Sequence, residues 1–169
     1  MENFSLKKPN ENDEIEVMLY RKEFTDKNEY VNGSSGLSKI NIYKDWLKKI
    51  NDENNKNNNP VRSELLMIRQ SDNKIIGMTN IRHSLENGFE ISGGHIGYSI
   101  RPSERKKGYG NIILALALNY CKTLGIKNVL VTCNKENNAS KKVILNNGGK
   151  YENEIEENGE IIERFWIKN

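Results

Sequence analysis

The feature that most restricts this chain is a basic glycine loop between an expected strand and an expected helix. A strand-like run over residues 95–100 breaks at Arg101-Pro102, continues through Arg105-Lys106-Lys107, and reaches Gly108-Tyr109-Gly110 directly before the apolar helical run 111–118. Glycine lets the backbone adopt unusual dihedrals and approach a ligand closely, and a helix N-terminus favours anions. The order strand, basic glycine loop, helix therefore predicts a site for a pyrophosphate.

Other glycine-loop motifs fit this segment less well. The dinucleotide fingerprint G-x-G-x-x-G would begin at Gly108, but Ile113 stands where the third small residue belongs,. A P-loop requires Gly-Lys-Ser or Gly-Lys-Thr, and neither follows the glycines,. The run instead resembles the R/Q-x-x-G-x-G/A signature of the GNAT superfamily of acetyl-CoA-dependent N-acetyltransferases.

A second segment strengthens this resemblance. In the superfamily an Asn follows the next strand, a Ser or Ala comes three residues later, and a Gly closes the short helix eleven residues after the Asn. Asn137, Ser140 and Gly148 have that spacing. The resemblance covers residues 61 to 168, in which the two blocks are separated by one expected helix and one expected strand.

Length and composition set the broad class. A chain of 169 residues suits a single domain,, and we divide it into a helical acceptor-side region (1–60, with a flexible polar loop at 51–60), a cofactor-binding core (61–150) and a C-terminal hairpin (151–169). The net charge of +3 is low for a dedicated nucleic-acid binder. We expect a cytoplasmic protein, because neither a signal peptide nor a membrane span is apparent.

Hydrophobic periodicity and turn residues predict a mixed α/β layer fold. The first helix would bury Ile15, Met18 and Leu19, and Asn158-Gly159 predicts a hairpin turn,. The resemblance implies a mostly antiparallel mixed sheet with a central splayed parallel strand pair flanked by helices. The expected helices are 13–24, 43–50, 109–124 and 139–147, and the expected strands are 64–69, 74–82, 89–100 (interrupted at Gly93-Gly94), 127–133 and the two arms of the hairpin within 150–168.

The resemblance also implies a set of acetyl-CoA-binding residues. In the superfamily, pantetheine enters the gap between the splayed strands and bonds to strand backbone, while the glycine loop holds the pyrophosphate. The cofactor-binding residues expected on this basis are Tyr98, Ser99, Ile100, Arg105, Lys106, Lys107, Gly108, Tyr109, Gly110 and Asn111, with Asn137 and Ser140 on the other side.

Catalytic residues are less clearly indicated. Many family members carry a glutamate base two residues before the strand glycine, Gly97, and here that residue is His95, whose imidazole titrates near neutrality,. His83 and Glu90 are weaker candidates. The tyrosine acid that the family often has seven residues after the block asparagine is replaced by Ile144.

The proton for the leaving thiolate therefore has several candidate sources. Ser140, Tyr151 or a water would supply it, or the thiolate leaves unaided. Cys133 would have to be activated to act as an acyl-accepting nucleophile, and no base is placed near it by the sequence. We expect Cys121 and Cys133 to be free, packed thiols, with neither a disulfide nor a metal site,.

The leading functional hypothesis is an acetyl-CoA-dependent N-acetyltransferase acting on a primary amine by direct attack in a ternary complex. The acceptor would lie between residues 28–46 and the closing hairpin, whose acidic run 152–157 either attracts a cationic amine or discourages sheet pairing,. Two alternatives remain open, namely a CoA-binding regulatory module without transfer activity and a nucleotide- or RNA-binding domain. We expect no nucleic acid or membrane partner, and exposed strand edges leave a homodimer open.

Overall fold

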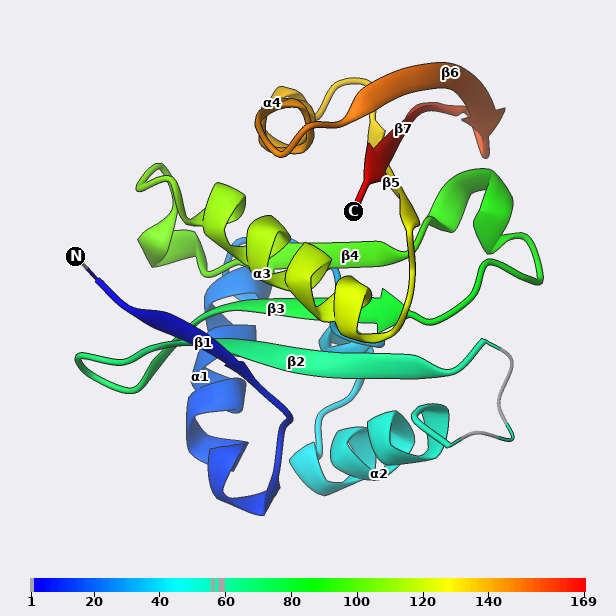
Figure 1. Cartoon of the computed structure of the whole chain (residues 1–169). Coiled ribbons are helices and arrows are strands. Elements are labelled where there is room, and N and C mark those ends of the chain that lie inside the picture. The colour runs from blue at the N-terminus through cyan, green and yellow to red at the C-terminus, as the bar shows by residue number, and fades with distance from the viewer. Residues whose placement is uncertain (1, 56, 58–59) are drawn as a thin grey trace.

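The computed structural model describes residues 2–55, 57 and 60–169. An N-terminal, mainly helical part is followed by a strand hairpin, a strand–helix–strand–helix series and a closing hairpin (Figure 1). In chain order they are β1 (Phe4–Lys7), α1 (Glu14–Thr25), α2 (Tyr43–Glu53), β2 (Arg62–Arg69), β3 (Lys74–Arg82), the π-helical turn η3 (Phe89–Gly93), β4 (Ile96–Ile100), α3 (Tyr109–Thr123), β5 (Asn128–Asn134), α4 (Asn138–Asn146), β6 (Lys150–Glu157) and β7 (Glu160–Lys168), with short 3₁₀ turns η1 (Glu11–Asp13), η2 (Leu37–Lys39) and η4 (Pro102–Glu104).

Two antiparallel sheets carry these elements. The first has the order β1-β2-β3-β4 and the second the order β5-β7-β6. The hairpin β6–β7 turns at Asn158-Gly159, where φ is positive at both residues (53° and 80°), as the predicted two-residue turn requires.

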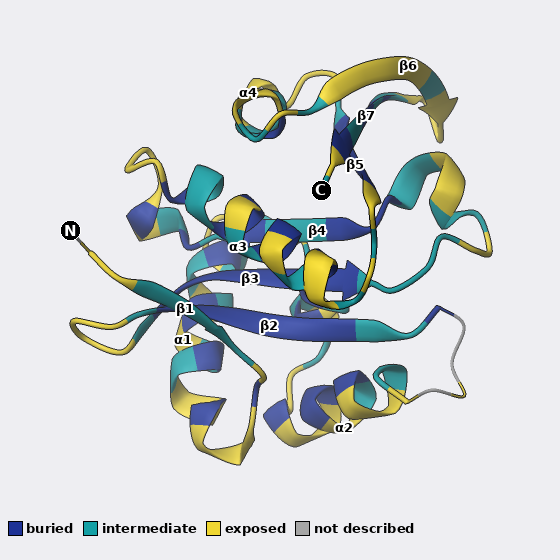
Figure 2. Ribbon diagram, viewed as in Figure 1, coloured by how far each residue is buried: buried dark blue, intermediate teal, exposed yellow. Residues whose placement is uncertain are grey.

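Helices cover both faces of the four-stranded sheet. In Figure 1, α3 crosses one face while α1 and α2 lie on the other. On the face covered by α1 and α2, Phe24 and Trp46 of the helices pack against Leu66 and Met78 of the sheet. On the opposite face, Leu114 of α3 and its neighbours pack against both sheets. Figure 2 shows the result, because β2 and β3 are almost entirely buried whereas β6 is exposed along most of its length.

The two sheets meet at the start of β4. The His95 N–H donates to the Leu130 carbonyl of β5 at 2.7 Å, and the Leu130 N–H donates to His95 Nδ1 at 2.9 Å. Beyond this point β4 and β5 share no ladder in the described part of the chain. The predicted mixed α/β fold with a splayed central pair is therefore confirmed, and the splay is wide enough to separate the strands into two sheets.

The turn η3 fastens the two sheets on the same side as this contact. The Ser92 carbonyl accepts a hydrogen bond from Thr132 Oγ1 at 2.6 Å, and the Ser92 hydroxyl donates to Glu157 at 2.8 Å. Arg164 of β7 donates to the Glu90 carbonyl at 2.8 Å. The gap between β4 and β5 thus has one fastened end and one open end.

Three sequence predictions need correction. The interrupted strand predicted over 89–100 begins only at Ile96, because Gly88 and Gly94 have positive φ (89° and 63°) and enclose the π-helical turn η3. The strand β1 was not predicted, and it pairs with β2 through Phe4 and Arg69. The polar loop predicted at 51–60 starts later, since α2 runs to Glu53, and residues 56, 58 and 59 of that loop lie outside the described residues.

The buried face of α1 also differs from the prediction. Ile15 is 77% exposed and Leu19 is 49% exposed, while Met18 is partly buried against the core. The residues that α1 buries fully are Val17, Tyr20 and Phe24. The helix presents this face because Tyr20 reaches across to β4, where its hydroxyl donates to the Ser99 carbonyl at 3.1 Å.

Candidate active site

A cavity of about 720 Å³ lies where the glycine loop, β4, the start of α4 and the segment after α1 come together. The two sequence blocks that were expected to act together therefore meet in space. The predicted cofactor residues that line this cavity are Tyr98, Ser99, Ile100, Arg105, Lys106, Gly108, Tyr109, Gly110, Asn111, Asn137 and Ser140.

Lys107 is the predicted cofactor residue that does not line the cavity. Its ammonium group donates to the carboxylate of Glu104 at 2.7 Å. Glu104 is almost completely buried and also contacts Arg69 and Lys74. Burial alone would raise the pKa of Glu104, but the hydrogen bonds from Lys107, Lys74 and Arg69 lower it to about 2. Lys107 thus neutralises a buried carboxylate beneath the loop.

The backbone of the glycine loop is shaped to receive an anion. Lys106 and Gly108 both have positive φ, 65° and 84°, and Gly108 is the N-cap of α3. Among the described residues, no acceptor receives the N–H groups of Lys106, Lys107 or Gly108. Successive N–H groups in such a left-handed turn converge on one point and form an anion-binding concavity, to which the N-terminus of α3 adds its partial positive charge.

Gly110 serves a different purpose from Gly108. A Cβ atom at Gly110 would lie 2.9 Å from Val143 Cγ2 of α4, whereas a Cβ at Gly108 would meet open space. Gly110 therefore allows α3 and α4 to pack closely, while Gly108 provides the positive φ of the loop. The sequence pattern alone did not distinguish these roles.

The start of α4 forms the opposite wall. The Asn137 side chain accepts a hydrogen bond from the Ser140 N–H at 3.0 Å and so caps the helix,. The Ser140 hydroxyl lies 3.1 Å from the Tyr98 hydroxyl of β4. Lys142 and Asn146 continue the wall along α4.

The third wall was not predicted residue by residue. Glu29, Tyr30 and Asn32, which follow α1, line the cavity. Glu29 forms a two-pronged ion pair with the Arg105 guanidinium, with one contact at 3.0 Å, and this hydrogen bonding lowers the pKa of Glu29. These residues lie far from the glycine loop in sequence and carry no motif, so only the general expectation that 28–46 frames the site pointed to them.

Residues 5–150 match a family model described as an acetyltransferase (GNAT) domain. The chain belongs to the GNAT acetyltransferase family. The predicted family and the predicted enzyme class, N-acetyltransferase, are thereby confirmed. No curated protein sequence matches the chain.

Solved GNAT structures share the fold over the whole chain. A ribosomal-protein-S5-alanine acetyltransferase from Vibrio fischeri superposes with a TM-score of 0.76 at 15% identity, covering 100% of this chain and 94% of that one. A spermidine N-acetyltransferase from Vibrio cholerae, in complex with CoA and spermine, gives 0.68 at 14% identity, covering 98% and 95%. A putative acetyltransferase from Salmonella typhimurium with its cofactor acetyl-CoA gives 0.67 at 10% identity, covering 98% and 93%. At identities this low, the superpositions show a shared fold and nothing about the substrate.

His95, expected to be the base of this GNAT site, lies outside the cavity lining. Its Nδ1 accepts the Leu130 N–H, so the proton of the neutral ring is on Nε2. Burial, followed by the nearby Arg82, lowers its pKa to about 4. The catalytic role of His95 stays a prediction, and this geometry disfavours it.

The weaker catalytic candidates also lie away from the cavity. His83 Nε2 lies 2.8 Å from Ser63 Oγ, and Glu90 accepts from the Gly88 N–H at 3.0 Å. Tyr151 is half exposed on β6 and packs against Phe165. Ile144, at the family's tyrosine position, is fully buried in the core. Of the candidates for the acid, Ser140 is the one that lines the cavity.

Both thiols are free and buried, as expected. Burial raises the pKa of Cys121 to about 12, and burial together with Glu163 raises that of Cys133 to about 11. Neither thiol is activated as a nucleophile would be. In the described part of the chain, no three His, Cys, Asp or Glu side chains are grouped to hold a metal ion, and no helix has the length and apolar character to span a membrane.

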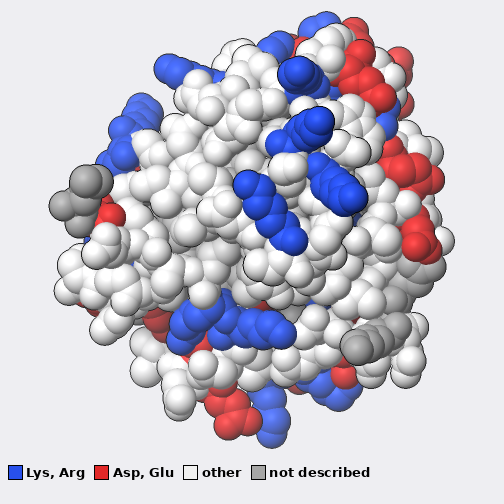
Figure 3. Space-filling view, viewed as in Figure 1, with Lys and Arg blue, Asp and Glu red and all other residues white. Residues whose placement is uncertain are grey.

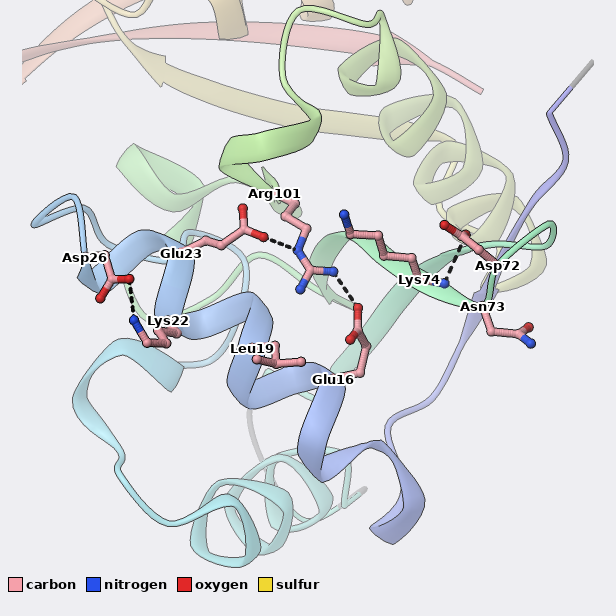
Figure 4. Close-up of a pocket in the computed structure, with 9 residues that line it drawn as sticks. All are labelled: Glu16, Leu19, Lys22, Glu23, Asp26, Asp72, Asn73, Lys74 and Arg101. Atoms are coloured by element: carbon pink, nitrogen blue, oxygen red, sulfur yellow. Dashed lines mark hydrogen bonds and ion pairs between the residues drawn. The ribbon is translucent and has the colours of Figure 1, made fainter.

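A second cavity, of about 570 Å³, lies between α1 and the turn that joins β2 to β3. Figure 4 shows that its charged side chains are engaged with one another, since Arg101 lies between Glu16 and Glu23 of α1. None of the predicted site residues lines it. Its charges hold α1 against the end of β4, so we assign it a structural role.

Charge is distributed unevenly over the molecule. In Figure 3 the acidic side chains gather toward the upper right, on the side where Figure 1 shows the β6–β7 hairpin. Within the acidic run of β6, Glu152 pairs with Arg164 at 2.9 Å and Glu154 with Lys135 at 2.8 Å. These pairs neutralise part of the charge that was considered for attracting an amine.

Proposed function

We propose that this GNAT protein transfers the acetyl group of acetyl-CoA to a primary amine by direct attack within a ternary complex. The observation that carries the proposal is the single cavity in which the glycine loop and the start of α4 face each other. The cavity is large enough for a substantial part of a nucleotide-containing ligand, given the usual range of about 300–1,000 Å³ for small-molecule sites.

The pyrophosphate would bind at the glycine loop. The unpaired N–H groups of Lys106, Lys107 and Gly108 supply the donors, and the side chains of Lys106 and Lys142 in the cavity wall supply charge. Arg105 also lines the cavity, but its charge is shared with Glu29. The donor set and the charge therefore fit a phosphate ligand.

The pantetheine arm would run along the open edge of β4. That strand pairs with β3 on one edge, while its other edge has no partner strand beyond the His95 contact in the described structure. An extended amide-containing chain can therefore lie beside Tyr98, Ser99 and Ile100 and bond to the strand as a further strand would. The same backbone would polarise the thioester carbonyl.

The acceptor amine would enter beside the segment that follows α1. Tyr30 is 68% exposed although it lines the cavity, so it offers a free aromatic surface next to the proposed acetyl position. The nucleophile must be the neutral amine. We assign no base, because Nδ1 of His95 already accepts the Leu130 N–H.

Calorimetry tests the cofactor assignment directly. The purified protein is titrated with acetyl-CoA, desulfo-CoA and ATP at fixed salt, beside the double variant Lys106→Glu, Lys142→Glu. We expect wild-type binding of acetyl-CoA in the micromolar range and a loss of at least about tenfold in the variant, since both charges face the phosphates. Lys122→Glu, a charge reversal near the far end of α3, is the matched control.

The outcomes separate the candidate functions. Binding of acetyl-CoA followed by amine-dependent release of CoA, scored with a thiol reagent over a panel of amines, supports the acetyltransferase. Binding without such release favours the regulatory module. Equal affinity for ATP and acetyl-CoA, falling steeply with salt, favours the nucleotide-binding alternative, and no binding by the folded wild type overturns the proposal.

We extend the proposal to the whole chain as one functional domain, with 1–60 forming the acceptor side, 61–150 the cofactor core and 151–169 the closing hairpin. A cytoplasmic location, a homodimer and the absence of a nucleic-acid partner stay predictions.

A further inference from the structure

The hydroxyl groups of Tyr98 and Ser140 meet in the cavity wall although they come from different elements. Tyr98 belongs to β4 and Ser140 to α4, and their oxygens lie 3.1 Å apart. Both residues line the cavity, and the Tyr98 ring packs against the core cluster beneath α3. This pair bridges the open end of the gap between the two sheets.

Each partner is held in place by other contacts. Asn137 accepts the Ser140 N–H at 3.0 Å, which fixes Ser140 in the first turn of α4. Tyr98 is held on its strand by the pairing of β4 with β3, where it lies opposite Thr79. The short distance between the two hydroxyls is therefore a product of the fold.

Either hydroxyl can donate in this contact, and the relay proposed below uses the arrangement in which the Tyr98 phenol is the donor,. Burial raises the pKa of Tyr98 to about 12, against the opposing effect of its hydrogen bond with Ser140. The phenol therefore keeps its proton at any physiological pH and can donate it to Ser140 Oγ. Ser140 then has its own O–H free to donate to a further acceptor.

The Ser140 hydroxyl already lies near a sulfur atom. Burial and Glu163 raise the pKa of Cys133, whereas hydrogen bonding from Ser140 acts in the opposite direction. Cys133 itself stays protonated, but a hydroxyl that donates to sulfur at this position favours the ionised form of that sulfur,. A substrate sulfur in the cavity would compete for the same donor.

Building on the proposed function, we propose that Tyr98 and Ser140 form a hydroxyl relay that stabilises the departing thiolate of CoA. Tyr98 donates to Ser140, and Ser140 donates to the sulfur. When the C–S bond breaks, its electron pair goes to sulfur, and the proton that the amine nitrogen loses ends on that sulfur, so no proton is consumed. Ser140 is the catalytic residue and Tyr98 is a positioning residue that acts through it.

The relay accounts for the isoleucine at the family's tyrosine position. Ile144 is fully buried in the core below α4 and does not line the cavity. A phenol from β4 instead approaches the same helix from across the gap. A tyrosine of the facing strand β4 would thus contribute the hydroxyl that α4 lacks at Ile144.

The thiol of bound CoA provides a direct test that needs no acceptor amine. Thiolate absorbance is titrated between pH 7 and pH 10 for the CoA complexes of wild type, Tyr98→Phe and Ser140→Ala, with the desulfo-CoA complex subtracted. Cys133 and Cys121 contribute little in this range because their pKa values are about 11 and about 12. The pKa of the CoA thiol is the measured quantity.

We expect the thiol pKa to be lower in the wild-type complex than in free CoA. Ser140→Ala should raise it by about one unit, since a hydrogen bond to a charged group is worth that much. Tyr98→Phe should raise it by about half a unit while leaving the affinity for desulfo-CoA within twofold.

Tyr120→Phe is the matched control. It removes the hydroxyl of another tyrosine–serine pair, 3.2 Å from Ser63 Oγ, away from the cavity lining, and should leave the thiol pKa unchanged.

A wild-type thiol pKa equal to that of free CoA overturns the relay, and so does a Tyr98→Phe complex whose thiol pKa is identical to that of wild type. Weaker binding of both CoA and desulfo-CoA by Tyr98→Phe, without a pKa change, assigns Tyr98 a packing role and also overturns it. Absence of CoA binding by folded wild type overturns the proposed function itself.

Discussion

Gly33 lies directly on the backbone of Gly97, so the segment after α1 rests on β4 without any side chain between them. A Cβ atom on Gly33 would lie 2.3 Å from the Gly97 carbonyl oxygen, and the φ of Gly33 is 64°. The contact presses the acceptor side of the fold against the strand that lines the cavity. Glycine is required at Gly33 for two independent reasons, its conformation and its lack of volume.

Gly33→Ala should therefore destabilise the protein strongly. Backbone strain and the forced displacement of β4 together should cost about 2–4 kcal/mol in the free energy of unfolding. Gly36→Ala is the control, because Gly36 has a φ of 84° but open space around it, and strain alone should cost about 1 kcal/mol. Urea denaturation of both variants measures the difference, and equal losses would contradict the packing argument.

Gly110 and Val143 should show energetic coupling. Alanine at Gly110 would favour the helix by up to about 1 kcal/mol, but its Cβ would lie 2.9 Å from Val143 Cγ2. We expect Gly110→Ala to destabilise wild type and to stabilise a Val143→Ala background, giving a coupling of about 1 kcal/mol in a double-mutant cycle. Chemical denaturation of the four proteins measures it, and additive effects would show that α3 and α4 do not press on each other here.

His95 should make the protein sensitive to mild acid. Its pKa in the folded state is about 4, below the ordinary value of 6.5, so the unfolded chain binds the proton more readily. Stability should be fully present above pH 6.5 and fall by up to about 3 kcal/mol as the pH drops toward 4. In His95→Asn, whose amide oxygen can still accept the Leu130 N–H, this part of the decline should disappear. Thermal unfolding across pH 4–7 compares the two profiles.

Glu64 should contribute a pH dependence of stability that has the opposite sign to that of His95. It is buried, accepts a hydrogen bond from Asn80 at 3.1 Å, and leaves Oε1 with no partner among the described residues. Burial raises its pKa well above 4.5, so the folded state favours the protonated form. The protein should lose stability as the pH rises above 4.5, by at most about 1.4 kcal/mol per pH unit, until the folded-state pKa is passed.

Glu64→Gln should remove this loss. The variant should be more stable than wild type at pH 8, with the difference shrinking toward pH 4.5. Glu156→Gln, at an exposed position on β6, is the control and should follow the wild-type profile. A Glu64→Gln profile parallel to wild type would show that folding does not raise the pKa of Glu64.

Local patterns predicted most elements of this fold because their signals lie within each segment. The glycine after α3 and the Asn158-Gly159 turn mark element ends through backbone conformation alone. The face of α1 could not be predicted in the same way. Tyr20 is buried because its hydroxyl finds Ser99 on a distant strand, and the apolar Ile15 is left in solvent.

The same distinction holds for the candidate site. The glycine loop and the Asn137 cap are local motifs, and the structure brings them into one cavity. The Glu29 ion pair with Arg105 and the Tyr98 contact with Ser140 depend on how distant elements meet. No spacing within the chain encodes such contacts, so they appear only when the layers are assembled.

The fastening of the two sheets at one end has a mechanical consequence. The hydrogen bonds of His95, Ser92 and Glu90 to the second sheet all lie beside η3, while the other end of the gap contains the cavity. No strand ladder therefore sets the width of the gap at its other end, which depends instead on the side chains packed between α3 and the two sheets. The shape of the cavity accordingly rests on side-chain contacts such as those between Tyr98 and Ser140 and between α3 and α4, and substitutions in those contacts would alter it before they altered either sheet.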